Sequence, residues 1–202
     1  MKYPEYIFVT GVPGSRWTSF TETLAETGEF NITDRNEQRY YVHHGKARHQ
    51  GSFFGVGMEF PAKLNKENFD APFTDKGGTK FLCSHEWALM LPEIKWKYPD
   101  AWIMMIYRPT MNALQWWSEA GGFGSSDKSD GIKYPNYGWY QDADTMHRKI
   151  IKQNQMILEF GQQHQAEWVH TGKSFYKKFF DQELEPSKNQ TSQPDILATV
   201  IK

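Results

Sequence analysis

A short turn from Gly11 to Ser15 has the residue types and the position that anion chemistry requires. It follows an apolar run, Ile7 to Val9, that is typical of a buried strand, and it precedes apolar residues at helical spacing from Trp17 to Leu24. A glycine-bearing turn between a strand and a helix directs backbone N–H groups and the positive end of the helix dipole to one point. This arrangement predicts a cradle for a phosphate-like anion. A turn with a structural role alone is the alternative.

The start of the helix after this turn lacks the lysine of an ATPase phosphate loop. A Walker loop needs Gly-Lys followed by Ser or Thr at the mouth of the helix, whereas this chain has Arg16, Trp17 and Thr18 there. The sequence therefore disfavours a kinase or nucleotide hydrolase of the Walker type. The helix dipole disfavours a cation at a helix start, so the position of Arg16 favours an anionic partner.

The remaining segments predict the elements that must position this turn. Strand-like runs and helical periods alternate along the chain: strands at Thr79–Cys83, Ala101–Tyr107 and Glu167–His170, and helices at 87–98, 110–120, 145–164 and 175–180. Such alternation is typical of an α/β fold with a central, mostly parallel sheet. The most apolar run, Ala101–Tyr107, is expected to be a central parallel strand that is covered on both faces.

Length, charge and cysteine content narrow the classes of protein. The chain has 202 residues and a net charge of −1, which suits one domain over 1–202 and argues against a general nucleic-acid binder. Its one cysteine, Cys83, excludes a disulfide framework and a cysteine-rich zinc site. No apolar segment has the length of a signal peptide or a membrane span, so we expect a cytoplasmic protein without a membrane or nucleic-acid partner. The sequence does not indicate an oligomeric state.

Several polar segments are expected to connect these elements. Residues 31–50 are polar and rich in His and Arg, and they are either a solvated connection or a cationic flank that binds an acidic substrate. Their three histidines could be metal ligands, but no second cluster of spaced ligands accompanies them, so no metal site is expected. Residues 121–131 are expected to form a mobile loop, which either closes over bound ligands, with Lys128 as its cation, or is a plain connection. A polar linker is expected at 185–194, and the tail at 195–202 either docks or frays.

Three blocks resemble, in the same order and at similar spacing, the sulfotransferases that use 3′-phosphoadenosine 5′-phosphosulfate (PAPS). Residues 10–19, Thr-Gly-Val-Pro-Gly-Ser-Arg-Trp-Thr-Ser, resemble the 5′-phosphosulfate loop of that family. Cys83-Ser84-His85, with a Leu-Pro pair at 91–92, resembles its Lys-Thr-His segment. Residues 98–109, from Tyr-Pro-Asp-Ala to Tyr-Arg-Pro, resemble its segment for the 3′-phosphate.

The resemblance implies a role for each matched residue. The loop would hold the 5′-phosphate of the donor, Arg16 would stabilise the leaving oxygen, and His85 would be the general base, with Glu86 as the alternative base. Arg108 would hold the 3′-phosphate together with Gln115 or with Ser118, one turn further along the helix. No metal is required. The loop residues implied in donor binding are Pro13, Gly14, Ser15, Arg16, Trp17, Thr18 and Ser19.

The chain differs from the family pattern at two points. Gly14 stands where the family usually has Lys or Arg after the loop proline, and the family's Arg-x-Pro turn is shortened to Arg108-Pro109.

Trp116 and Trp117 are expected in the core or in the wall of the site, with stacking on adenine as the alternative.

The expected function is transfer of a sulfuryl group from PAPS to a hydroxyl or amine of a small-molecule or glycan acceptor, on a P-loop-like three-layer α/β/α domain. Two alternatives stay open. One is a P-loop kinase or nucleotide hydrolase. The other is a nucleotide-binding module of the same fold that lacks catalytic activity.

Overall fold

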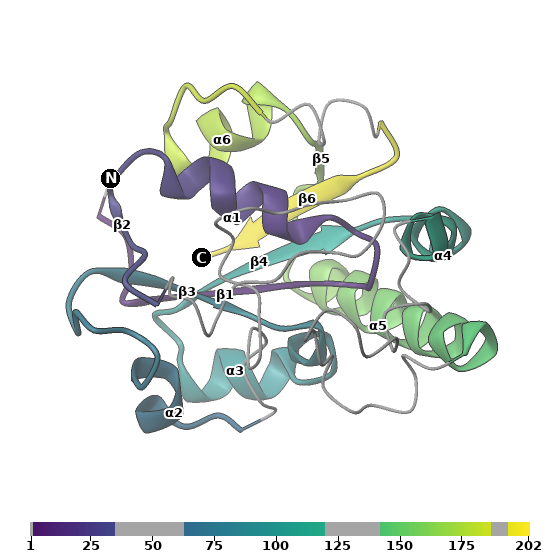
Figure 1. Ribbon diagram of the computed structural model, residues 1–202, viewed down its shortest axis with the longest axis horizontal. Coiled ribbons are helices and arrows are strands. Elements are labelled where there is room, and N and C mark those ends of the chain that lie inside the picture. The colour runs from purple at the N-terminus through teal and green to yellow at the C-terminus, as the bar shows by residue number, and fades with distance from the viewer. Residues whose placement is uncertain (1, 35–62, 120–141, 187–193) are drawn as a thin grey trace, which may run out of the picture.

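The computed structural model describes residues 2–34, 63–119, 142–186 and 194–202. Within these ranges the chain forms an α/β fold with a mixed six-stranded sheet and six α-helices (Figure 1). The strands are β1 (Tyr6–Gly11), β2 (Phe30–Asn31), β3 (Thr79–Cys83), β4 (Trp102–Tyr107), β5 (Val169–His170) and β6 (Leu197–Ile201). The helices are α1 (Trp17–Ala25), α2 (Lys66–Asp70), α3 (Leu91–Lys97), α4 (Thr110–Glu119), α5 (Ala143–Gln163) and α6 (Lys173–Phe180), and a 3₁₀-helix, η2 (His85–Leu89), follows β3.

The strand order is β2-β3-β1-β4-β6-β5, and the first four of these strands are parallel. β6 runs antiparallel to both β4 and β5, so the expectation of a mostly parallel sheet is only partly right. The sequence left open whether the tail at 195–202 docks or frays. It docks, because residues 197–201 form β6. The direction of β6 depends on the end of the sheet at which the chain enters this strand, and no local sequence pattern predicts that end.

Helices cover both faces of the sheet because its central strands are apolar on both faces (Figure 1). Ile7 and Val9 of β1 pack on the face that carries α1 and α6. Tyr6 and Phe8, which alternate with them, pack on the opposite face with residues of α2, α3 and α5. The expected helices 87–98 and 145–164 correspond to η2 with α3 and to α5.

A third, smaller apolar cluster joins the turn after β1 to two helices. It consists of Val12, Ala113 and Trp117 with Met146 and Ile150 of α5. Burial of these side chains fixes the turn against α4 and α5. This cluster therefore sets the position of the predicted anion cradle, and Trp117 is a core residue, as expected.

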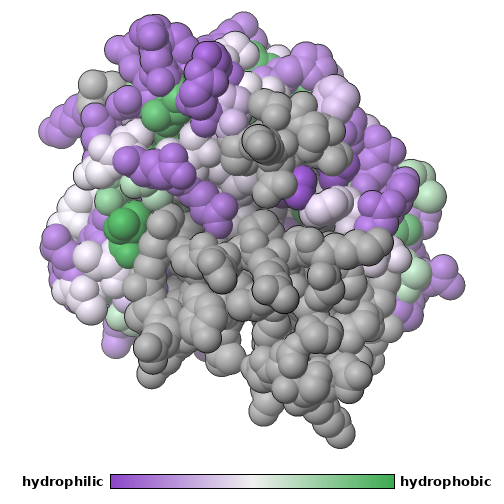
Figure 2. All heavy atoms as spheres, turned by 45° about the horizontal axis from the view of Figure 1, so that its top comes forward, coloured by the Kyte–Doolittle hydropathy of each residue, from purple (hydrophilic) through white to green (hydrophobic). Residues whose placement is uncertain are grey.

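The surface on the side of α1 and α6 is mainly hydrophilic (Figure 2). No helix within the described ranges is long and apolar enough to span a membrane. The histidines of 31–50, the 121–131 loop with Lys128, and residues 187–193 of the linker lie outside the described residues.

Candidate functional site

The three sequence blocks meet at one edge of the sheet. β1, β3 and β4 are parallel neighbours, so their carboxyl ends bring together the turn after Gly11, the Ser84–His85 pair and Arg108. Ligands of open α/β sheets bind at this edge. The fold thus places side by side the segments that the sequence selects from distant parts of the chain.

The turn between β1 and α1 is tightly folded and is held against α4. The amide of Ser15 donates to the carbonyl of Val12 over 2.9 Å. Gly14 has a φ of 82°, and a Cβ atom added there would collide with the carbonyl group of Ala113, whose carbon would be only 2.9 Å away. Arg16, the residue before α1, also has a left-handed backbone, with φ at 63°. This turn therefore accepts no side chain at position 14 without moving away from α4.

Arg108 is buried and connects the turn to the C-terminal segment. Its Nη1 donates to the carbonyl oxygen of Gly14 over 2.8 Å, and its Nε donates to Oδ2 of Asp195 over 2.8 Å. The same Asp195 oxygen accepts from Nδ2 of Asn112 over 2.9 Å. Burial raises the pKa of Asp195, but the hydrogen bonds from Arg108 and Asn112 outweigh it and hold this pKa below its usual range.

His85 is buried against the same turn on its other side. Its Nδ1 contacts the carbonyl oxygen of Gly11, and Nε1 of Trp17 lies 3.1 Å from Nδ1 and 3.4 Å from Nε2. A carbonyl only accepts, so the contact with Gly11 places the proton on Nδ1; the Trp17 indole, which only donates, then has Nε2 as its acceptor over 3.4 Å. Ser84, not His85, caps η2, because its hydroxyl accepts from the amide of Glu86.

Glu86, the alternative base, points to α5 and not to the turn. Its carboxylate forms a 2.8 Å ion pair with Nζ of Lys149, and both side chains are mostly buried. The ion pair holds the Glu86 carboxylate towards α5, so His85 is better placed than Glu86 to accept a proton at the turn.

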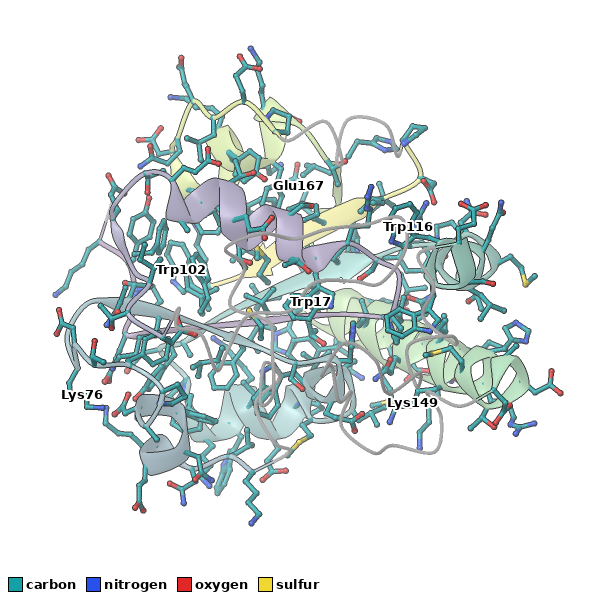
Figure 3. All side chains as sticks on the ribbon, in the orientation of Figure 1. Trp17, Lys76, Trp102, Trp116, Lys149 and Glu167 are labelled. Carbon is teal, nitrogen blue, oxygen red and sulfur yellow. The ribbon has the colours of Figure 1, made fainter. Side chains whose placement is uncertain are left out.

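Arg16 lies between the turn and α4, where it stacks on an indole ring. Its guanidinium carbon is 3.8 Å from the ring centroid of Trp116. Burial, and then the charge of Arg108, lower the pKa of Arg16 to about 10. Figure 3 shows Trp116 on the side of α4 that faces the turn. An anion between the two arginines would remove their mutual repulsion.

The remaining predicted site residues divide into a buried and an exposed group. Ser15 is fully buried, and its Oγ has no hydrogen-bond partner among the described residues. The Ser19 hydroxyl donates to the carbonyl of Arg16 within α1 over 2.8 Å. Gln115 is exposed and donates to Glu119 over 2.8 Å, and Ser118 is also exposed. Pro13 is buried and Thr18 is half-buried.

A pocket of about 350 Å³ adjoins Arg108 on the side of α4. Its lining residues are Arg108, Asn112, Gln115, Trp116, Glu119 and Asp195. Gln115 thus shares a pocket with Arg108, whereas Ser118 is not among the residues that line it. Two carboxylates also lie in this wall, so an anionic group that enters must approach the arginine and avoid Asp195 and Glu119.

The sequence did not point to several residues of this site. Asp195 accepts from both Arg108 and Asn112, and Gln153 and Asn154 of α5 donate to the backbone carbonyls of His85 and Arg108. Polar residues that interrupt the apolar stripe of α5 were the only available signal for the last two. No group of three potential metal ligands occurs in the part of the chain that the structure describes.

Comparisons with protein-family models, with characterised proteins and with solved structures found no match.

Proposed function

We propose that the protein is a sulfotransferase that moves a sulfuryl group from PAPS to a hydroxyl or amine of a small-molecule or glycan acceptor. The fold proposed with it is a P-loop-like, three-layer α/β/α domain. One observation carries the proposal: His85 and Arg108, which follow β3 and β4, each contact a backbone carbonyl of the turn that the sequence predicts as an anion cradle. The three blocks of the resemblance thus form one structural unit.

The turn and its two arginines supply what sulfuryl transfer requires. The reaction is an in-line displacement in which negative charge spreads over the transferred group and the leaving phosphate, so positioning and electrostatic stabilisation do most of the work. The amides at the start of α1 would bind the 5′-phosphate. Arg16 would stabilise the leaving oxygen, and Arg108, with Gln115 in the same pocket, would bind the 3′-phosphate.

His85 would complete the proton balance. The acceptor oxygen or nitrogen forms its bond to sulfur, the bond from sulfur to the 5′-phosphate oxygen breaks, and Nε2 of His85 takes the acceptor proton. The contact of Nδ1 with the Gly11 carbonyl supports this role because it fixes the tautomer in which Nε2 is basic.

A nucleotide-binding module without catalytic activity is the second candidate, and Asp195 favours it. This carboxylate already pairs with Arg108, and a 3′-phosphate must compete with it. The kinase alternative has less support, because the turn lacks the Walker lysine and leaves no room for a side chain at Gly14.

Calorimetry with three nucleotides tests the proposal. Adenosine 3′,5′-bisphosphate should bind about tenfold or more tightly than AMP, since a charge-assisted bond contributes about 1.5–3 kcal/mol, and Arg108→Ala should remove most of this ratio. Preference for ATP with magnesium would identify a kinase or hydrolase instead. Transfer of radiolabelled sulfate from PAPS to a broad acceptor panel then separates the enzyme from the inactive module. Equal affinity for the bisphosphate and AMP would refute the donor assignment.

A further inference from the structure

We propose that Gln153 and Asn154 of α5 are positioning residues, each of which holds one half of the site through its backbone. Gln153 fixes His85, the proton acceptor, and Asn154 fixes Arg108, the 3′-phosphate ligand. This inference rests on the function proposed above, because it assigns each amide to one of the two roles. It adds that the two amides together set the relative position of the carboxyl ends of β3 and β4.

The contacts are short and buried. Nε2 of Gln153 donates to the carbonyl oxygen of His85 over 2.8 Å, and Nδ2 of Asn154 donates to that of Arg108 over 2.8 Å. Nδ2 of Asn154 is also 3.3 Å from Oγ1 of Thr110, the first residue of α4. Gln153 is 0% exposed and Asn154 is 5% exposed. A carbonyl only accepts, so both amide groups must turn their NH₂ towards the strand ends.

Two neighbouring residues of one helix suit this task geometrically. Consecutive side chains of an α-helix diverge by about 100°. The carboxyl ends of β3 and β4 lie on either side of β1, about two strand spacings or 10 Å apart. A helix that packs under β1 at this edge can therefore reach one strand end from each of two successive positions. Lys149, one turn before Gln153, reaches Glu86 on the same side (Figure 3).

Each amide is only half satisfied: its NH₂ binds a backbone carbonyl and its oxygen has no partner in the described ranges. Oε1 of Gln153 and Oδ1 of Asn154 are buried without a hydrogen-bond partner in the described ranges. A buried polar atom without a partner costs stability, which offsets part of what the hydrogen bond of each amide contributes. Residues that leave a buried polar atom without a hydrogen-bond partner are typical of functional positions.

Two isosteric variants and a matched control test the proposal. Gln153→Met and Asn154→Leu keep the volume and remove the donor. Gln155→Met is the control, because Gln155 is exposed on the same helix and bonds only to Glu159 among the described residues. The measurements are turnover of PAPS, the ratio of affinities for adenosine 3′,5′-bisphosphate and AMP, the ¹⁵N resonances of the His85 ring, and Tm.

The two variants should affect different measurements. Gln153→Met should shift the His85 ring resonances and lower turnover about tenfold or more, with the affinity ratio unchanged. Asn154→Leu should move the affinity ratio towards one and leave the His85 resonances in place. Each variant leaves a backbone carbonyl without its donor, so both should lower Tm by similar amounts, about 2–12 °C. Equal effects of both variants on every measurement, or effects no larger than those of Gln155→Met, would overturn the assignment of separate roles.

The proposed function and this inference can fail separately. If the wild-type protein does not distinguish the bisphosphate from AMP, the proposed function fails, whereas the His85 resonances still report whether Gln153 holds the ring. If the wild-type protein makes that distinction and Asn154→Leu retains it, the inference fails and the proposed function stands.

Discussion

The backbone of Gly14 lies so close to that of Ala113 that no side chain fits between them. An added Cβ would be 2.9 Å from the carbonyl carbon of Ala113 and 3.2 Å from its Cα. The proposed resemblance to PAPS-dependent sulfotransferases would put a Lys or Arg at this position, and the turn has no room for one. Arg16, two residues later, is the cation that lies beside the turn. The turn packs directly on α4.

Substitution of Gly14 should lower the free energy of unfolding more than substitution of a glycine that has a positive φ but no close neighbour. Gly28 has a similar φ of 74°, but an added Cβ there meets no atom within 4 Å. Gly28→Ala should cost about 1–2 kcal/mol of unfolding free energy, the usual cost of a left-handed residue with a side chain. Gly14→Ala should cost at least about 3 kcal/mol, because steric overlap adds to the strain. Urea denaturation measures both, and equal costs would show that α4 adapts to the extra atom.

Replacement of Arg16 should separate ligand binding from stability. Arg16→Gly relieves the left-handed backbone, which costs about 1–2 kcal/mol for a residue with a side chain, and loses a cation–π contact of about 0.5–2 kcal/mol. These two terms have opposite signs, so the measured change in the free energy of unfolding reports which of them is larger. The affinity for adenosine 3′,5′-bisphosphate should fall about tenfold, because a charge-assisted contact is lost. Unchanged affinity in calorimetry would exclude Arg16 from the anion site.

Two substitutions of His85 should distinguish its two nitrogens. In His85→Asn, the amide nitrogen takes the place of Nδ1 and still donates to the Gly11 carbonyl, while the basic nitrogen is absent. Turnover should fall by about 10²–10⁴ with bisphosphate affinity nearly intact. His85→Ala removes both functions, so it should also weaken nucleotide binding. If His85→Asn retains turnover within a few-fold, the ring serves only to hold the turn.

Asp195 should compete with a bound 3′-phosphate. Asp195→Asn retains an oxygen that accepts from Arg108 but removes the negative charge, so bisphosphate affinity should rise about tenfold, or about 1.4 kcal/mol. AMP affinity should change less. Asp181→Asn, an exposed aspartate paired with Lys177, is the control. A fall in bisphosphate affinity would show that Asp195 orients Arg108 for the phosphate and does not compete with it.

The buried lysine of β3 makes stability depend on nearby carboxylates at the opposite edge of the sheet, Asp70 at 2.7 Å and Glu5 at 3.9 Å. Lys80 is 0% exposed and forms a 2.7 Å ion pair with Asp70, which also accepts from the hydroxyl of Tyr6 over 2.9 Å. Burial raises the pKa of Asp70, but the hydrogen bonds from Lys80 and Tyr6 and nearby positive charge hold it below its ordinary value. The stability that this depressed pKa contributes is present above the unfolded pKa and is lost as pH falls towards the folded pKa.

Asp70→Asn should therefore destabilise the protein at pH 7 by up to about 3–5 kcal/mol, because it leaves the buried Lys80 charge with only the longer, 3.9 Å contact to Glu5 as an ion pair. The difference from the wild type should shrink below about pH 4, where the wild-type carboxylate also begins to lose its charge. Urea denaturation at both pH values measures this difference. Asp100→Asn, which changes an exposed aspartate, should have little effect at either pH. A pH-independent cost for Asp70→Asn would contradict the electrostatic explanation.

Local patterns predict most of the fold because the central strands are buried on both faces. Each of β1, β3 and β4 is an apolar run bounded by turn residues, and α5 shows a clear helical period. The antiparallel direction of β6 was not predictable from such patterns. It depends on where the chain enters the sheet, and neighbouring residues do not determine that.

Only the residues of the candidate site that directly follow the strands could be predicted from the sequence. His85 and Arg108 are recognisable because each follows a strand whose end faces the same edge. Asp195, Gln153 and Asn154 come from the far end of the chain, and their contacts arise only when β6 and α5 pack on the sheet. A single sequence does not show that these polar residues contact the candidate site, because polar side chains are mostly exposed.

The central strand has consequences for how the protein acquires its site. β4 pairs with β1 on one side and β6 on the other, so both of its neighbours are separated from it by almost half of the chain. Proteins dominated by such non-local pairs fold slowly, because loop closure must precede the contacts that stabilise it. The proposed anion site has no local precursor: its turn, His85 and Arg108 come together only when these distant pairings are complete. Binding of adenosine 3′,5′-bisphosphate at the proposed site should therefore appear in the last kinetic phase of refolding, together with the native sheet.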